Sequence, residues 1–190
     1  MSLIPALEIG IWNGWIFMIW PWIATLAVRL AGPDVYRRAS GIPSEMRTSR
    51  QYRLVSYVSM TVEAMALAYS IFLPLKLGTA WFYAGLGIFS AGLVVLTAAI
   101  LSFATAPMDA PIKKGIYHYS RHPMYLGSIL IYLSVGIASA SWVFLLIFIL
   151  QSVSIRTAAV EEERYCLEKY GDAYRKYMER TPRYLGTPKS

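Results

Sequence analysis

The chain has 190 residues, of which 56% are hydrophobic and only 15% charged, and its formal net charge is +7 at pH 7. Soluble globular proteins carry roughly 25% charged residues, so this composition argues against a soluble domain. The basic residues lie between apolar stretches, where a membrane protein places them beside anionic lipid, and we expect no nucleic-acid partner. Cys166 is the single cysteine, which excludes an internal disulfide and a multi-cysteine zinc site.

The apolar stretches predict an all-α membrane protein. A transmembrane helix needs about 20 apolar residues to cross a hydrocarbon core of roughly 30 Å. Residues 11–30, 54–75 and 80–104 meet this requirement, although Pro21 is expected to bend the first. Residues 124–159 are too long an apolar run for one helix. A break at Ser-Ala-Ser-Trp, residues 139–142, predicts a tight hairpin whose arms each fall a little short of a full crossing. We therefore expect about five transmembrane helices and a charged, helical C-terminal tail.

The distribution of basic residues predicts the topology. Six lie between residues 29 and 53, three between 113 and 121, and eight from residue 156 onward, whereas the opposite side receives only Lys76. Lysine and arginine accumulate on the cytoplasmic side of membrane proteins. We therefore expect the N-terminus outside and the C-terminus in the cytoplasm.

The segment Ser-Arg-His-Pro-Met-Tyr-Leu-Gly, residues 120–127, is the first candidate site. Pro123 suits the first turn of a helix and pushes His122 out of the α conformation. Arg121 and His122 therefore precede the unpaired N–H groups of a helix start, which attract anions such as carboxylate or phosphate. A lipid-headgroup anchor with a capping histidine is the alternative. His118 lies four residues before His122, but the proline context argues against a helix there and no third ligand is evident, so we expect no metal site.

Three glutamates, Glu161, Glu162 and Glu163, directly follow the last apolar stretch and form the second candidate site. On their own they indicate a solvated amphipathic helix. In a shallow membrane cleft, however, clustered carboxylates attract a cationic ligand. A helix start that attracts anions, next to an acidic cluster, is complementary to a zwitterion.

These motifs together resemble the isoprenylcysteine carboxyl methyltransferase family and the wider group of membrane methyltransferases that includes phospholipid N-methyltransferases. The resemblance covers roughly residues 111–185. The residues that carry it are Gly115-x-Tyr117, the run 120–127, Glu162-Glu163, Tyr170-Gly171, Tyr174, Tyr177 and Pro182-Arg183.

The resemblance implies S-adenosylmethionine as the methyl donor and a lipophilic acceptor that arrives from the bilayer, an isoprenylcysteine-like carboxylate or a related lipid. It divides a single domain, residues 1–190, into a three-span scaffold (1–105) and a part with the cofactor-binding loop, hairpin and cytoplasmic tail (106–190). Glu162, Glu163 and Arg183 are then the catalytic residues, with Arg180 as a second candidate toward the acceptor. The implied cofactor-binding residues are Ile116, Tyr117, Arg121, His122, Tyr125 and Glu162.

Other functions stay open on the sequence. A phospholipid, small-amine or thiol acceptor must lose a proton, which would give a glutamate of residues 161–163 the role of general base. An NADPH-dependent reductase of the sterol type and a non-catalytic membrane scaffold are further alternatives. The sequence does not specify the oligomeric state.

Two features of the apolar stretches need their own interpretation. Gly85, Gly87 and Gly92 lie inside an apolar span, where small residues allow close helix packing rather than dinucleotide binding. Glu63 lies about 14 Å into the second span, where an ionisable group is costly. It either lines a cavity or pathway, or is a protonated or tyrosine-paired acid that fixes helix contacts.

Overall fold

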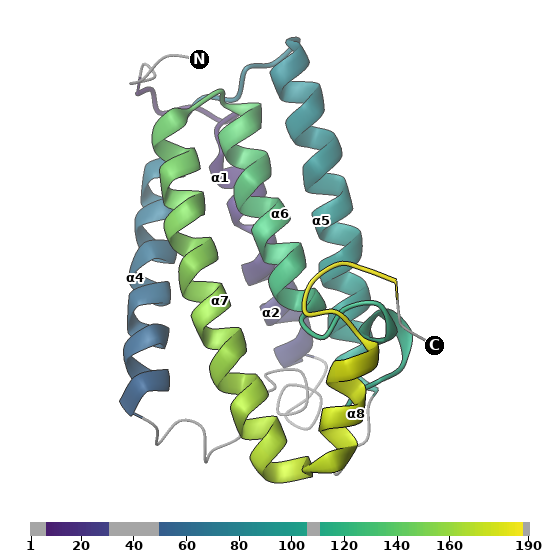
Figure 1. Cartoon of the computed structure of the whole chain (residues 1–190). Helices are drawn as coiled ribbons and strands as arrows, with labels where there is room; N and C mark the ends of the chain where they lie inside the picture. The colour runs from purple at the N-terminus through teal and green to yellow at the C-terminus, as the bar shows by residue number, and fades with distance from the viewer. Residues whose placement is uncertain (1–6, 31–49, 106–110, 188–190) are drawn as a thin grey trace.

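The computed structural model describes residues 7–30, 50–105 and 111–187, and within these ranges it is helical with no named strand. Its helices are α1 (Trp15–Met18), α2 (Trp20–Leu30), α4 (Arg50–Ile71), α5 (Ala80–Ala104), the 3₁₀ helix η2 (Gly115–His118), α6 (Pro123–Ala138), α7 (Trp142–Tyr170) and α8 (Asp172–Arg180). The long helices run side by side, and α8 folds back at the end of the bundle where α7 ends (Figure 1). A polar segment is predicted at residues 31–53, of which residues 31–49 lie outside the described residues and residues 50–53 begin α4.

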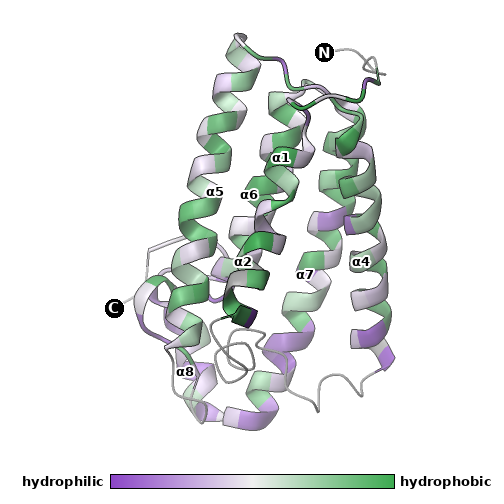
Figure 2. Ribbon diagram, turned by 180° about the vertical axis from the view of Figure 1, so that it is seen from behind, coloured by the Kyte–Doolittle hydropathy of each residue, from purple (hydrophilic) through white to green (hydrophobic). Residues whose placement is uncertain are grey.

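Three helices are long and apolar enough to cross a membrane: α4 over Tyr52–Ile71, α5, and α7. Apolar residues cover most of the bundle, while hydrophilic residues gather at the end that carries α8 (Figure 2). The apolar helices over Trp15–Leu30 and Pro123–Ala138 are shorter than the other three. The all-α membrane architecture is therefore confirmed in its coarse form, and the number of five crossings stays a prediction.

The predicted hairpin after residue 123 is present, but its second arm is longer than expected. α6 ends at Ala138, and the Ser141 side chain caps α7 by accepting a hydrogen bond from the Phe144 N–H. The expected short second arm is wrong, because α7 does not end before the glutamates. It runs from Trp142 through them to Tyr170, a total of 29 residues or about 43 Å. Glutamate is a good helix former, and the helix ends only where Gly171 adopts a positive φ of 52°.

The first apolar stretch departs most from the prediction of a continuous helix over residues 11–30. Helix begins only at Trp15 and is interrupted at Ile19, close to Pro21, which lacks the N–H that a helix interior requires. The residues before Trp15 instead cap α4. The Asn13 side-chain amide donates to the Ile71 carbonyl at 2.7 Å, and Asn13 pairs with Pro74. α4 accordingly ends at residue 71 rather than 75.

α5 occupies residues 80–104 as predicted and packs closely against α6 through small residues. A Cβ atom on Gly85 would lie 2.5 Å from the Ala138 Cβ, and one on Gly127 would lie 2.9 Å from the Leu96 Cβ. Gly87, in contrast, has nothing within 4 Å. Close packing is therefore confirmed for Gly85 and not for Gly87, and it fixes the height at which α6 begins.

Glu63 lies half-buried on α4, near the hydroxyl of Tyr132 on α6, with which it interacts electrostatically. The Tyr132 hydroxyl is buried and has no hydrogen-bond partner in the described part of the chain. One turn from Glu63, Ser59 accepts a hydrogen bond from the Gln151 amide of α7 at 3.0 Å. The Gln151–Ser59 bond joins α7 to α4, and the role of Glu63 stays open between the two interpretations.

Candidate functional site

The C-terminal tail crosses the start of α6 and is held there by backbone hydrogen bonds. The Arg121 N–H donates to the Pro182 carbonyl at 3.0 Å, and the His122 N–H donates to the Arg183 carbonyl at 3.1 Å. The Ser120 hydroxyl adds a bond of 3.2 Å to the same Arg183 carbonyl. Two candidate segments separated by about 60 residues in the sequence are therefore joined into one site.

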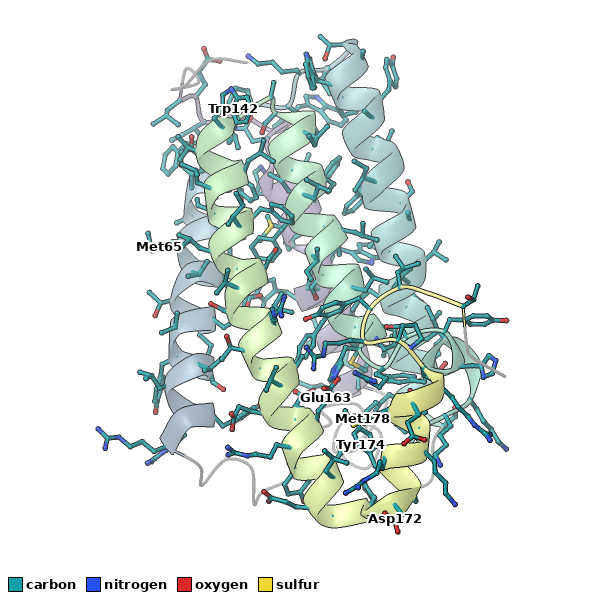
Figure 3. All side chains as sticks on the ribbon, in the orientation of Figure 1. Met65, Trp142, Glu163, Asp172, Tyr174 and Met178 are labelled. Atoms are coloured by element: carbon teal, nitrogen blue, oxygen red, sulfur yellow. The ribbon has the colours of Figure 1, made fainter. Side chains whose placement is uncertain are left out.

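Glu163 is the centre of this site, and it lies on the side of α7 that faces α8 and the tail (Figure 3). Its carboxylate accepts hydrogen bonds from Arg121 (Nε, 3.0 Å) and Arg183 (Nε, 3.0 Å; Nη2, 2.6 Å), and its Oε1 lies 3.2 Å from His122 Nε2. Glu163 lies beyond the apolar part of α7, and its side chain is only 4% exposed. Burial raises the pKa of Glu163, but the bonds with His122 and Arg183 and the Arg121 charge outweigh it and lower the pKa to about 2. Glu163 is therefore an ionised anchor and a weak base.

Arg121 ties the tail to α7. Its Nη1 donates to the Met178 carbonyl at 2.8 Å and to the Thr181 carbonyl at 3.0 Å, at the end of α8, while Nε and Nη2 bind Glu163. The anion expected beside Arg121 and His122 is thus supplied by the chain itself. A direct contact between Arg121 and a cofactor stays a prediction.

His122 lies between two carboxylates. Its Nδ1 is 3.5 Å from Glu162 Oε2, and its Nε2 is 3.2 Å from Glu163 Oε1. Burial lowers the pKa of His122, but the hydrogen bonds with Glu162 and Glu163 outweigh it and raise the pKa above its usual value. The two carboxylates thus favour the form of His122 in which both ring nitrogens carry protons.

Glu162 forms the more open side of the site. The Tyr125 hydroxyl donates a hydrogen bond to Glu162 Oε1, and the Tyr125 ring stacks on His122 with centroids 5.5 Å apart and planes at 13°. The Glu162 side chain is 26% exposed, compared with 4% for Glu163. Glu161 points elsewhere and forms an ion pair with Arg164 at 2.8 Å. The structure therefore selects Glu162 and Glu163 as the pair around His122.

The other predicted residues lie at the edge of this cluster. The Ile116 carbonyl accepts backbone hydrogen bonds within its own turn, and the Tyr117 carbonyl accepts a bond of 2.6 Å from the Tyr177 hydroxyl. Both carbonyls are used inside the protein, and their contact with a cofactor stays a prediction. Arg180 is exposed at the end of α8, whereas Arg183 reaches Glu163. Within the described ranges, no group of three or more histidine, cysteine or acidic side chains is arranged to hold a metal ion.

Two tyrosines that the sequence did not single out also reach the site. Tyr184 follows Arg183, and its ring lies 6.4 Å from that of His122. Tyr52, near the start of α4, is buried and interacts electrostatically with Tyr125. The position of Tyr184 beside a candidate arginine was a usable signal, but Tyr52 lies 68 residues before the first candidate motif and gives none.

A family model described as phospholipid methyltransferase matches residues 75–173, just over half of the chain. The chain belongs to the phospholipid methyltransferase family. The match covers α5, η2, α6 and α7, and so includes His122 and both site glutamates but not Arg183. It confirms the resemblance to the membrane methyltransferases, and this phospholipid methyltransferase family member is an integral membrane protein. No curated protein and no solved structure matched the chain.

Proposed function

We propose that the protein transfers a methyl group from S-adenosylmethionine to the amine of a membrane phospholipid at the cytoplasmic face. The observation that carries this proposal is the closure of two carboxylates, Glu162 and Glu163, around His122 at the end of a membrane helix in a chain of this family. Family membership favours methyl transfer over an NADPH-dependent reductase and over a non-catalytic scaffold. The basic residues favour a cytoplasmic C-terminus, an outside N-terminus and five crossings.

The side chains of the site have the chemistry that S-adenosylmethionine requires. Carboxylates and aromatic faces stabilise cations, and Glu162 and Tyr125 offer both to an ammonium or sulfonium group. Arg183 places positive charge next to them and the raised pKa of His122 favours its cationic form, which suits the methionine carboxylate. When bound, S-adenosylmethionine supplies a methyl group on positively charged sulfur, open to displacement by a nucleophile.

Glu162 is the residue that best fits the role of general base. An alkylammonium group is protonated at neutral pH and must lose its proton to a base before its nitrogen becomes a nucleophile. Glu163 is neutralised by two arginines, and the raised pKa of His122 favours its protonated form. Glu162 is partly exposed, and the hydrogen bond from Tyr125 fixes the direction of its carboxylate. Glu163 then positions His122 and Arg183 and takes no proton itself.

One observation favours a second acceptor, an isoprenylcysteine-like carboxylate. The Arg183 side chain is 30% exposed, so part of its guanidinium can still face an anion. A carboxylate attacks without losing a proton and would need Arg183 for orientation, not Glu162 as a base. A thiol acceptor, like an amine, would need the base.

The test uses the purified full-length chain with methyl-labelled S-adenosylmethionine. Phosphatidylethanolamine, farnesylated cysteine and a lipid-free blank are compared as acceptors. We expect label in phosphatidylethanolamine and a fall of about 10²-fold or more in rate for Glu162→Gln, the range for loss of a general base. Arg164→Gln, an exposed neighbour on α7, is the matched control and should keep its rate. Absence of S-adenosylmethionine binding by calorimetry, or NADPH binding in its place, would reject the proposal.

A further inference from the structure

Arg156 is the one charged residue in the apolar part of α7, residues 142–160. It is exposed, and in the described part of the chain it forms no ion pair with a carboxylate. The positions one turn away on α7 are Ser152, Val153, Ala159 and Val160. An arginine in an apolar helix is costly unless it reaches the membrane interface or a partner. Its own helix offers no such partner.

Helix geometry places Arg156 on the face of α7 that the tail crosses. Arg156 precedes Glu163 by seven residues, which is two turns and about 10 Å along the same face. Arg183 of the tail binds Glu163 at 2.6 Å. The next residue, Tyr184, interacts electrostatically with Arg156. Arg156 is therefore a neighbour of the site that lies on its membrane side.

The Tyr184 hydroxyl supplies the second observation. Its oxygen is sheltered from solvent, yet it has no hydrogen-bond partner within the described residues. A sheltered hydroxyl without a partner is costly, so a ligand that accepts its hydrogen bond is favoured. The acids near Tyr184 are already bound, because Glu163 holds Arg121 and Arg183, and Glu162 holds Tyr125.

Arginine and a hydroxyl donor together select an anion with several oxygens. A guanidinium binds phosphate through two parallel hydrogen bonds, and it does so best where water is scarce. Arg156 lies five residues before Glu161, where α7 changes from apolar to charged, and we expect the lipid phosphates to lie near this boundary. Inorganic phosphate is free in water, whereas the acyl chains of a phospholipid hold its phosphate at the membrane surface.

We propose that Arg156 and Tyr184 bind the phosphodiester of the acceptor phospholipid, so that Arg156 selects phosphate-bearing acceptors. This inference rests on the proposed function. The Tyr184 ring is 6.4 Å from His122, whose Nδ1 is 3.5 Å from Glu162, so the phosphate and the base lie on neighbouring parts of one site. A short head group held by its phosphate at Arg156 would thus direct its amine toward Glu162.

The kinetic test compares two acceptors with the same amine. One is phosphatidylethanolamine, and the other is a dialkylglycerol aminoethyl ether, which has no phosphate. Arg156→Gln should raise the KM for phosphatidylethanolamine by about tenfold or more, the effect of losing a charge-assisted hydrogen bond, with kcat within about twofold. The KM for the ether should not change, Arg156→Lys should recover part of the loss, and Tyr184→Phe should raise the same KM less. Arg164→Gln is the control. An equal rise of KM for both acceptors, or no rise, would overturn the proposal.

A binding measurement separates this proposal from the proposed function. Native mass spectrometry in detergent would count phosphatidylethanolamine and the ether bound to the intact protein, whether or not methyl transfer occurs. Preferential retention of phosphatidylethanolamine that Arg156→Gln abolishes and Arg164→Gln keeps would support the phosphate site even if neither lipid is methylated. Equal retention by the wild-type chain and Arg156→Gln would reject it, even if methylation of phosphatidylethanolamine is confirmed.

Discussion

Replacing each site glutamate by glutamine gives a matched pair of variants. Glu163→Gln should mainly lower the stability of the fold, whereas Glu162→Gln should mainly lower the rate of methyl transfer. Glu163→Gln keeps the shape of the side chain but leaves Arg121 and Arg183 without their anion. The Glu163 and Arg121 side chains are 4% and 9% exposed, and breaking a buried ion pair costs about 3–5 kcal/mol. The Arg183 side chain is 30% exposed and keeps part of its hydration. We therefore expect Glu163→Gln to lower the free energy of unfolding by the smaller value of this range, about 3 kcal/mol. The Glu162 side chain is 26% exposed, and Glu162→Gln should lower the free energy of unfolding by only about 1 kcal/mol.

Thermal unfolding in detergent, followed by tryptophan fluorescence, measures the difference. A loss of 3 kcal/mol should lower the Tm of Glu163→Gln by roughly 6–12 °C in a chain of this size. Glu162→Gln should stay within a few degrees of the wild type while losing methyl transfer. Equal Tm values for the two variants, or a more stable Glu163→Gln, would refute the assignment of Glu163 as the structural anchor.

Four further outcomes are expected. Gly85→Ala should destabilise by about 1–3 kcal/mol because its Cβ would overlap Ala138, whereas Gly87→Ala should be neutral or stabilising in the same unfolding assay. Tyr125→Phe removes the hydrogen bond to Glu162 and should lower kcat roughly tenfold at nearly unchanged Tm. The pKa of His122 is raised by folding, so its stabilisation is complete below about pH 6.5 and is lost as pH rises through the folded pKa. His122→Gln should remove this decline from a plot of Tm against pH between 6 and 9. If Glu63 is neutral in the bundle, Glu63→Gln should have a free energy of unfolding within about 1 kcal/mol of the wild-type value. A much larger loss of stability in the same unfolding assay would instead indicate that Glu63 is charged and has a charged partner.

The helices that could be predicted are those whose signals are local. Residues 80–104 combine an uninterrupted apolar run with Thr79 as a cap, and Pro123 marks a helix start, so both boundaries were correct. The start at residue 11 failed because Asn13 bonds the end of α4, a contact 58 residues away that apolar composition cannot reveal. The sequence predicts an apolar arm and a charged helix after it, but it does not show that the two form one continuous helix, which glutamate and arginine allow.

The composition of the site was more predictable than its connections. The motifs and the family resemblance they carry indicated His122, Tyr125, Glu162 and Glu163, and these four side chains do meet. The sequence could not show that Glu163 is held by Arg121 and Arg183, since the choice between adjacent glutamates depends on which face of α7 meets the tail. A hydrogen bond or ion pair between distant segments leaves no periodic signal in a single sequence.

The short length of α6 has a consequence for the surrounding bilayer. Its 16 residues span about 24 Å, less than a typical hydrocarbon thickness of roughly 30 Å, and the Gly85 contact with Ala138 prevents α6 from sliding along α5. With α6 as one of the five predicted crossings, the lipid next to it would thin, or the start of α6 would sit below the plane of the head groups. In both cases thicker bilayers would hold acceptor head groups farther from His122 and Tyr125. Acyl-chain length in reconstituted membranes becomes a means of tuning the enzyme without changing a residue.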